Sequence, residues 1–277
     1  MNKKENCFGI CEWYMGLSGP SAVRIASALG LDGIQLGDLG GAAQNFPLLD
    51  PFIQEQYLQA AAGGAVLHSL HTFTLTREGG MRYPMNSAQG ESAVHSFRQG
   101  LKACEALHIP VIMVASFDAS HVRNDYDMEN TGKMLKHFAQ LSKDSGVQLT
   151  YEAAAVLTDR QLWLLDYVGE GLKLCYDTLN PLRNGSGDPQ VEIPRFGIDR
   201  IDHIHVKDAP ADMIGCCPVG EGAGRVSSTI NLAKKLGYRG WYFLENYYYL
   251  PPMNQMGFGT DLMKKDLRAL KLMLEGE

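Results

Sequence analysis

The feature that most constrains the fold is a regular alternation of short apolar runs with longer segments of helical pattern. Eight runs of strand length recur, at 7–12, 33–36, 65–71, 110–116, 147–152, 172–177, 202–207 and 240–245. Helical segments separate most of them, at 20–29, 51–62, 86–107, 127–145, 158–168, 227–236 and 261–274, with room for only a short helix at 189–199. Strands that alternate with helices in this way are typical of a parallel sheet in an α/β protein.

The number of repeats and the chain length select one architecture. Eight strand–helix repeats in 277 residues fit a (β/α)8 barrel, which typically needs about 250 residues. A doubly wound protein of two domains is the alternative, but it would need a glycine-rich G-x-G-x-x-G turn after its first strand. The sequence WYMG stands there instead, at 13–16. We therefore predict a single (β/α)8 TIM barrel domain over residues 1–277.

Composition narrows the kinds of partner. A hydrophobic content of 45% is ordinary for a globular protein, and the net charge of −6 gives none of the basic surplus of a nucleic-acid binder. No apolar stretch approaches the length of a membrane span, and the N-terminus lacks the apolar core of a signal peptide. The six cysteines show no C-x-x-C spacing and are interpreted as reduced thiols. We expect a cytoplasmic protein with no nucleic-acid or membrane partner. Whether the protein forms a homo-oligomer is left open.

Four predicted strands end in residues that bind metals. Glu152, Asp177, His205 and Glu245 close the last four strands, one repeat apart. The carboxyl ends of barrel strands meet at one mouth, where converging carboxylates repel each other unless a cation neutralises them. A single acid at a strand end is more often a helix cap or a surface ion pair, but four in succession favour a metal site. Three carboxylates and an imidazole suit one divalent ion: Mn²⁺, Co²⁺, Mg²⁺ or Zn²⁺.

Alternation along the strands supports this convergence. Residues two apart share a face of a strand, and on these four strands the faces opposite the candidate ligands are apolar. The ligand faces should therefore point into the barrel. His205 is the preferred imidazole ligand because it is nearer the mouth, whereas His203 is predicted to be a buried, hydrogen-bonded core residue one layer below.

These residues lie in motifs that resemble a known family. The stretch HIHVKD at 203–208 and the stretch VGEG at 219–222 are similar to the strand-seven pattern and the following turn of the xylose-isomerase-like TIM barrels. That group of sugar phosphate isomerases and epimerases includes ketose 3-epimerases and inosose dehydratases. The resemblance implies that Glu152 and Glu245 both bind the metal and move protons, while Asp177 and His205 only hold the metal. Many epimerases have a histidine three residues after the strand-six aspartate, where this chain has Asn180.

Six further residues are candidate substrate contacts: His71, Trp13, Asn180, Lys207, Glu12 and Arg225. His71 ends the third strand, where a core histidine is the alternative. Trp13 could stack on a sugar or simply cover the mouth. Lys207 points inward by alternation, and its alternative is a salt bridge to Asp208 or to the metal carboxylates. Arg225 could bind an anion or lie in solvent. Glu12 ends the first strand.

The sequence therefore predicts an enzyme. The preferred function is a divalent-metal-dependent sugar isomerase or epimerase that transfers a proton α to a carbonyl through a metal-stabilised enediolate. The same core could serve a lyase or dehydratase acting on an inosose or a 3-oxo-sugar, including C-glycoside cleavage. An endonuclease IV-like phosphodiesterase and a non-catalytic sugar-binding barrel are the remaining alternatives. The pattern does not choose the substrate or its phosphorylation state.

Overall fold

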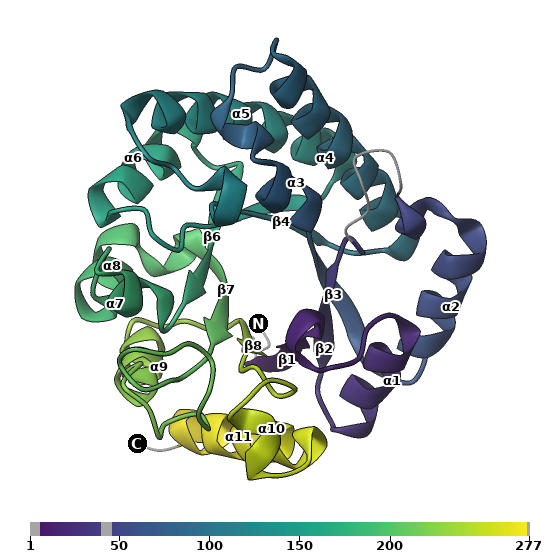
Figure 1. Ribbon diagram of the computed structural model, residues 1–277, viewed down its shortest axis with the longest axis vertical. Coiled ribbons are helices and arrows are strands. Elements are labelled where there is room, and N and C mark those ends of the chain that lie inside the picture. The colour runs from purple at the N-terminus through teal and green to yellow at the C-terminus, as the bar shows by residue number, and fades with distance from the viewer. Residues whose placement is uncertain (1–5, 40–45, 276–277) are drawn as a thin grey trace. The chain divides into compact units, whose positions relative to one another are not determined.

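The strands close into one parallel barrel in chain order (Figure 1). The computed structural model describes residues 6–39 and 46–275. The strands are β1 (Cys7–Cys11), β2 (Gly33–Gly37), β3 (Val66–His71), β4 (Val111–Ala115), β5 (Gln148–Glu152), β6 (Leu172–Asp177), β7 (Ile201–Val206) and β8 (Trp241–Leu244). The (β/α)8 prediction is confirmed, because helices separate the strands and all eight join one closed sheet.

The long helices lie where the sequence places them. They are α1 (Pro20–Ala28), α2 (Pro51–Ala61), α4 (Ala88–Leu107), α5 (Asp125–Ser145), α6 (Thr158–Val168), α8 (Pro189–Phe196), α9 (Val226–Lys235) and α11 (Gly259–Glu275). Three short helices were not predicted: α3 (Phe73–Glu78), α7 (Asn180–Asn184) and α10 (Met253–Met256). Each has fewer than two turns, which is too little for a periodic apolar pattern. All three follow the carboxyl end of a strand, where the loops that form barrel active sites lie.

Gly30, Gly146, Gly171 and Gly237 lie in the sequence where a helix should end before a strand, a position that favours a left-handed residue. Gly30, Gly146 and Gly237 adopt positive φ after their helices, as the pattern predicts, but Gly171 does not. Gly169 ends α6 with φ 83° instead. Gly171 is needed for a different reason, because a Cβ there would lie 2.9 Å from the Cβ of Ala139. A close approach between β6 and α5 explains this glycine.

The chain forms two compact units: residues 1–35, 60–66 and 176–277, and residues 36–59 and 67–175. In the first, β1 pairs with β2 and β8, and β7 pairs with β8. A Cβ on Gly9 would meet the Phe243 ring at 2.2 Å, and one on Gly33 would meet the Trp241 ring at 2.8 Å. These glycines make room for the aromatic side chains on β8. Figure 1 shows α9 beside α11 in the same unit.

Ring contacts confirm the predicted faces of β7 and β8. The His203 and Phe243 rings lie 5.5 Å apart, and His205 lies 5.4 Å from His203 on the same face. Tyr242 is on the opposite face, where its ring stacks on Phe8. Odd-numbered residues of these strands therefore share the inner face, as alternation predicts.

The second unit packs around β3, β4 and β5, which pair in parallel. Phe97 of α4 and Phe138 of α5 are fully buried, and their rings stack 3.9 Å apart with an angle of 5°. This contact joins the two longest helices over the strands. None of the helices in the described part of the chain is both long and apolar enough to span a membrane.

Candidate active site

Three of the predicted metal ligands come together in the first unit. Asp177 ends β6, His205 lies near the end of β7, and Glu245 follows β8 directly. One ligand atom from each lies within 4.8 Å of the others, and all three residues are buried. Two atoms bound to one ion are separated by at most the sum of their bond lengths, about 4–5 Å. The donor set therefore fits one small divalent ion. Glu152 is the last residue of β5, in the second unit, and it is also buried.

Lys207 supplies a positive charge to this cluster. Its Nζ lies 2.9 Å from Oδ2 of Asp177 and 2.6 Å from Oε2 of Glu245. Lys207 therefore forms the ion pair with the metal carboxylates that we considered as the alternative, and its contact with a substrate stays a prediction. Burial raises the pKa of Glu245, but the opposing effects of Lys207 and His205 are larger together. The pKa of Glu245 is therefore well below its ordinary value. Glu245 is therefore a carboxylate at neutral pH.

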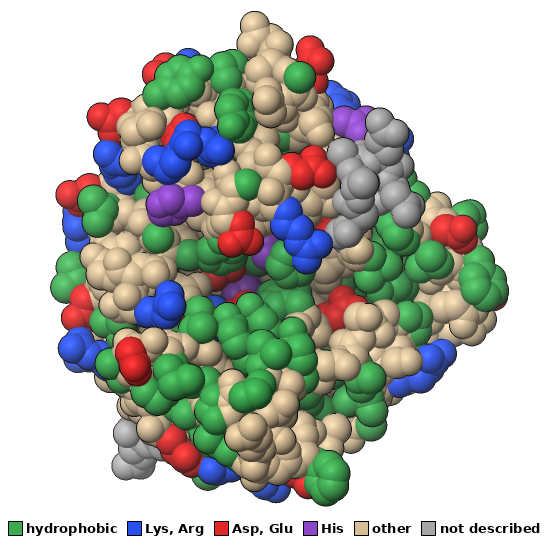
Figure 2. All heavy atoms as spheres, in the orientation of Figure 1, with side chains coloured by type: hydrophobic (Ala, Val, Ile, Leu, Met, Phe, Trp, Pro, Cys, Tyr) green, Lys and Arg blue, Asp and Glu red, His purple; other side chains and the backbone are tan. Residues whose placement is uncertain are grey.

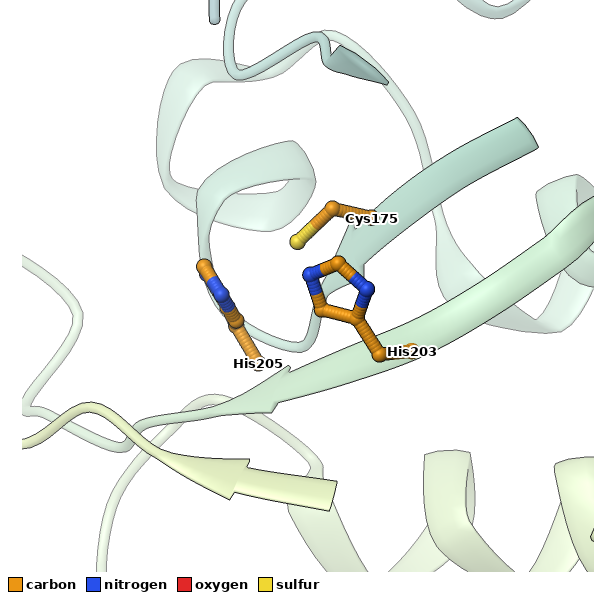
Figure 3. Close-up of side chains that lie close together, drawn as sticks. All are labelled: Cys175, His203 and His205. Carbon is orange, nitrogen blue, oxygen red and sulfur yellow. The ribbon is translucent and has the colours of Figure 1, made fainter. Parts of the chain in front are cut away.

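A chain of hydrogen bonds fixes the orientation of His205. The rings of His203 and His205 project from β7 (Figure 3). Nδ1 of His203 lies 2.9 Å from Asp202, and Nε2 of His203 lies 3.4 Å from the amide nitrogen of Gln35. Oε1 of Gln35 then lies 2.6 Å from Nε2 of His205. Because that oxygen only accepts, Nε2 of His205 donates the proton.

Nδ1 of His205 lies 3.3 Å from Oε2 of Glu245 and is the ring nitrogen that would face an ion. A histidine that donates one N–H to a neighbouring oxygen while the other nitrogen faces carboxylates has the usual arrangement of a metal ligand. His203 is the buried core histidine that we predicted. Gln35 was not predicted, although alternation along β2 from the inward-facing Gly33 identifies it as an inner-face polar residue.

Backbone donors orient Asp177. Its Oδ1 accepts hydrogen bonds from the N–H groups of Leu179 and Asn180, at 2.8 and 2.6 Å. Oδ2 is thereby left on the side of Lys207. Asn180 begins α7 and is buried, so its backbone has a positioning role. Contact between its side chain and a substrate stays a prediction.

Trp13 touches Glu245. It lies in a turn of 3-10 helix after β1 (Glu12–Tyr14) and donates its indole N–H to Oε1 of Glu245 at 3.0 Å. Its ring stands edge-on to His205, with centroids 6.1 Å apart. Glu12 accepts a hydrogen bond from the backbone N–H of Gly19, which ties the loop before α1 to the end of β1. Glu12 therefore holds this loop, and Trp13 orients a proposed ligand.

The glycine-rich loop after β7 surrounds an internal anion. The Asp208 carboxylate accepts hydrogen bonds from the N–H groups of Gly220, Gly222 and Gly224, at 2.9, 3.1 and 2.9 Å. A Cβ on Gly222 would lie 2.3 Å from this carboxylate. The loop amides thus bind Asp208 where a phosphate loop would bind its ligand. This explains why the aspartate and the glycine-rich turn occur together.

Two other candidates have protein partners of their own. Arg225 caps α9, is exposed, and pairs with Asp188 at 2.9 Å. This exposed ion pair agrees with the surface alternative, and anion binding by Arg225 stays a prediction. His71 ends β3 in the second unit, where its ring lies 3.9 Å from that of Phe73 and 3.4 Å from the hydroxyl of Thr76. These contacts are compatible with both interpretations of His71, and its role stays a prediction.

The three tyrosines after β8 have three environments. Tyr247 stacks on Tyr14, with ring centroids 3.8 Å apart, and burial raises the pKa of both phenols. Tyr248 is buried and donates its hydroxyl to Asp266 on α11 at 2.8 Å. Tyr249 is exposed. Figure 2 shows hydrophobic side chains gathered over the region of β1, β8 and α10. Tyr14 and Tyr247 are thus partly accessible aromatic residues next to the cluster.

Comparisons with known proteins agree with the fold. A sequence model of the family described as xylose isomerase-like TIM barrel matches residues 23–272. A 2-epi-5-epi-valiolone 7-phosphate 2-epimerase of an Actinoplanes species is 29% identical over 230 residues, covering 80% of each chain. The L-ribulose-5-phosphate 3-epimerase UlaE of Shigella boydii is 23% identical over 238 residues, also covering 80% of each.

Solved structures share the whole architecture. The D-psicose 3-epimerase of Clostridium cellulolyticum, solved with D-tagatose, has a TM-score of 0.77 and 15% identity, with 97% of this chain and 99% of that chain covered. The IOLI protein, solved with a zinc atom, has a TM-score of 0.74 and 12% identity, with 97% and 98% covered. At these identities the likeness concerns the fold.

Proposed function

Because this chain belongs to the xylose isomerase-like TIM barrel family, we propose that it is a divalent-metal-dependent sugar epimerase or isomerase. The observation that carries the proposal is the buried cluster of Asp177, His205 and Glu245, with the Lys207 ammonium between the two carboxylates. Burial of charged groups is costly even when they are paired, and perturbed carboxylates gather at functional sites. The curated relatives, both named as sugar phosphate epimerases, support this reaction class.

Four residues would hold the ion: Asp177, His205, Glu245 and Glu152. Glu152 is included because it is a buried acid at the end of β5, the strand that precedes β6 in barrel order. Mn²⁺, Co²⁺, Mg²⁺ and Zn²⁺ all accept such a donor set. When bound, the ion would act as a Lewis acid on the carbonyl and hydroxyl oxygens of the sugar.

Glu152 and Glu245 would move the proton. One glutamate removes it from the carbon next to the carbonyl, and the other returns it. Glu245 is already deprotonated, but a carboxylate held by Lys207 is a weak base. A substrate oxygen that attracts the Lys207 ammonium would raise the pKa of Glu245 and free Oε2 to accept the proton. Trp13 keeps Oε1 fixed during this exchange.

The substrate class we propose is a ketose or cyclic ketone with a hydroxyl next to the carbonyl, free or phosphorylated. Both curated relatives are named for phosphorylated substrates, and the structural neighbour for an unphosphorylated one. The six cysteines are free thiols, which supports a reducing cytoplasmic location.

The experiment is a substrate panel in D₂O. Chelator-treated protein is incubated with L-ribulose 5-phosphate, 2-epi-5-epi-valiolone 7-phosphate, D-tagatose or D-psicose, with and without each of the four ions. We expect deuterium to replace the hydrogen next to the carbonyl of at least one substrate, only when an ion is added. Undiminished exchange in the metal-free protein, or none with any substrate and ion, would contradict the proposal.

A further inference from the structure

Cys11 brings a thiol to the same cluster. It is the last residue of β1, and its strand pairs with β2 at Gln35 and with β8 up to Leu244, next to Glu245. One ligand atom from each of Cys11, His205 and Glu245 lies within 4.8 Å of the other two. Cys11 and His205 have no exposed surface, and Glu245 has 5%. The three donors are therefore enclosed as one compact group in the first unit.

The chemistry of this group differs from that of the carboxylate-rich set. Sulfur, imidazole nitrogen and carboxylate oxygen together favour borderline or soft ions, whereas Mg²⁺ prefers sites rich in oxygen ligands. Zinc bonds are about 2.3 Å to sulfur and about 2.0–2.2 Å to nitrogen and oxygen, so two ligands are at most about 4.5 Å apart. The three side chains satisfy this limit after shifts of a few tenths of an ångström.

We propose that Cys11, His205 and Glu245 form a second coordination set, containing a thiolate, that binds Zn²⁺, Co²⁺ or Cd²⁺. The inference rests on the proposed function, because it shares His205 and Glu245 with the carboxylate-rich set, so that one ion at a time uses them. On binding, the S–H bond of Cys11 breaks, a sulfur–metal bond forms, and the proton passes to the solvent.

The local contacts permit the exchange. The Cys11 thiol donates a weak hydrogen bond of 3.4 Å to Oε1 of Gln35, which is lost at small cost. Gln35 also accepts the short hydrogen bond from Nε2 of His205, so it can continue to orient the imidazole. Lys207 would give up Oε2 of Glu245 to the ion.

This set has a functional consequence. An ion held by Cys11 occupies Glu245, the residue proposed to carry the proton, and leaves Asp177 paired with Lys207. A thiophilic ion held by Cys11 would therefore inhibit the enzyme, whereas an ion in the carboxylate-rich set would activate it. Replacing the thiol should remove the inhibition without removing activation.

The test uses Co²⁺, because a thiolate bound to Co²⁺ gives a charge-transfer absorption in the near ultraviolet that oxygen and nitrogen ligands do not give. Metal-stripped wild-type protein, Cys11→Ser and the control Cys104→Ser are titrated with Co²⁺, and their thermal unfolding is followed to verify folding. Cys104 is also fully buried, but it lies on α4 in the second unit.

We expect the charge-transfer absorption in the wild type and in Cys104→Ser, and its loss in Cys11→Ser. Zn²⁺ affinity should fall at least about tenfold in Cys11→Ser, while Mg²⁺ affinity changes less than about threefold.

The outcomes separate this inference from the proposed function. Co²⁺ binding without the thiolate absorption overturns the second set and leaves the carboxylate-rich site standing. An absorption that survives in Cys11→Ser also overturns it. If Co²⁺ does not bind the wild type at all, both the second set and the metal-dependent function fail.

Discussion

The Nζ atom of Lys207 lies 2.6 Å from Oε2 of Glu245, and the residues that follow them, Asp208 and Asn246, are joined by a hydrogen bond of 2.9 Å. The ends of β7 and β8 are thus linked on both faces. The inner link is ionic and belongs to the proposed site. The outer link continues from the Asn246 amide to Asp266 of α11 at 2.8 Å. Because the outer link fixes the backbone, the inner pair can be exchanged for a ligand without loosening the strands.

Lys207→Met should separate metal binding from catalysis. The substitution removes a positive charge that competes with a cation for two carboxylates, so Mn²⁺ affinity should rise by at least about tenfold. Turnover should fall, because no ammonium is left to bind the substrate oxygen. Calorimetric titration with Mn²⁺ measures the first effect. Lys265→Met, which removes an exposed ion pair with Glu221, is the control. An unchanged or weaker Mn²⁺ affinity in Lys207→Met would contradict this role.

Asp177→Ala and His205→Ala should each abolish tight metal binding while the barrel stays folded. Both side chains lie at or near the carboxyl ends of their strands. Each variant is compared with the wild type by metal analysis after dialysis and by circular dichroism. Metal content equal to that of the wild type in either variant would show that the ion binds elsewhere.

Trp13→Phe should lower kcat/KM by about tenfold, because it removes one hydrogen bond to a charged carboxylate and keeps an aromatic ring. Trp163→Phe alters a half-exposed tryptophan of α6 and serves as the matched control. If Trp13 acts only by stacking on the sugar, the phenylalanine variant will retain nearly full activity.

Asp266→Asn should change the pH dependence of stability. Burial raises the pKa of Asp266 above its ordinary value, against hydrogen bonds from Val219, Asn246 and Tyr248 that lower it. The folded state therefore holds this proton more tightly than the unfolded chain does. The stabilising contribution is complete below the ordinary pKa of about 4 and declines as pH rises through the raised pKa.

In Asp266→Asn this decline is absent. The Tm of the wild type minus that of the variant should therefore shrink as the pH rises above about 4. Asp261→Asn, at an exposed position in the first turn of α11, is the matched control. If this difference in Tm instead grows with pH for Asp266→Asn, the prediction is wrong.

The strand and helix rhythm was sufficient to predict the barrel, because each repeat carries its own apolar pattern. Alternation also placed His203 and His205 on the same inner face correctly. The parts of the site that were missed depend on contacts between distant segments. The link from Gln35 to His205, and the enclosure of Asp208 by the loop at 220–224, join residues whose partners no local pattern specifies.

The role of Trp13 shows the same limit. Its position after β1 indicated an aromatic residue near the mouth, but the hydrogen bond to Glu245 depends on the ring orientation in a single turn of 3-10 helix. The position of Lys207 was predicted from alternation. Lys207 pairs with Asp177 and Glu245 because the adjacent Asp208 already accepts hydrogen bonds from the loop amides.

The most direct test of the central claim is solvent deuterium exchange by Glu152→Gln and Glu245→Gln, followed by NMR on both epimers of whichever panel substrate the wild type converts. Glutamine keeps an oxygen for the ion but accepts no proton, so metal binding should persist in part while conversion falls by at least about 10²-fold. If the two glutamates serve opposite faces of the substrate, each variant should still exchange the proton of one epimer and not of the other. Near-wild-type exchange and conversion in both variants would show that Glu152 and Glu245 are not the acid–base pair.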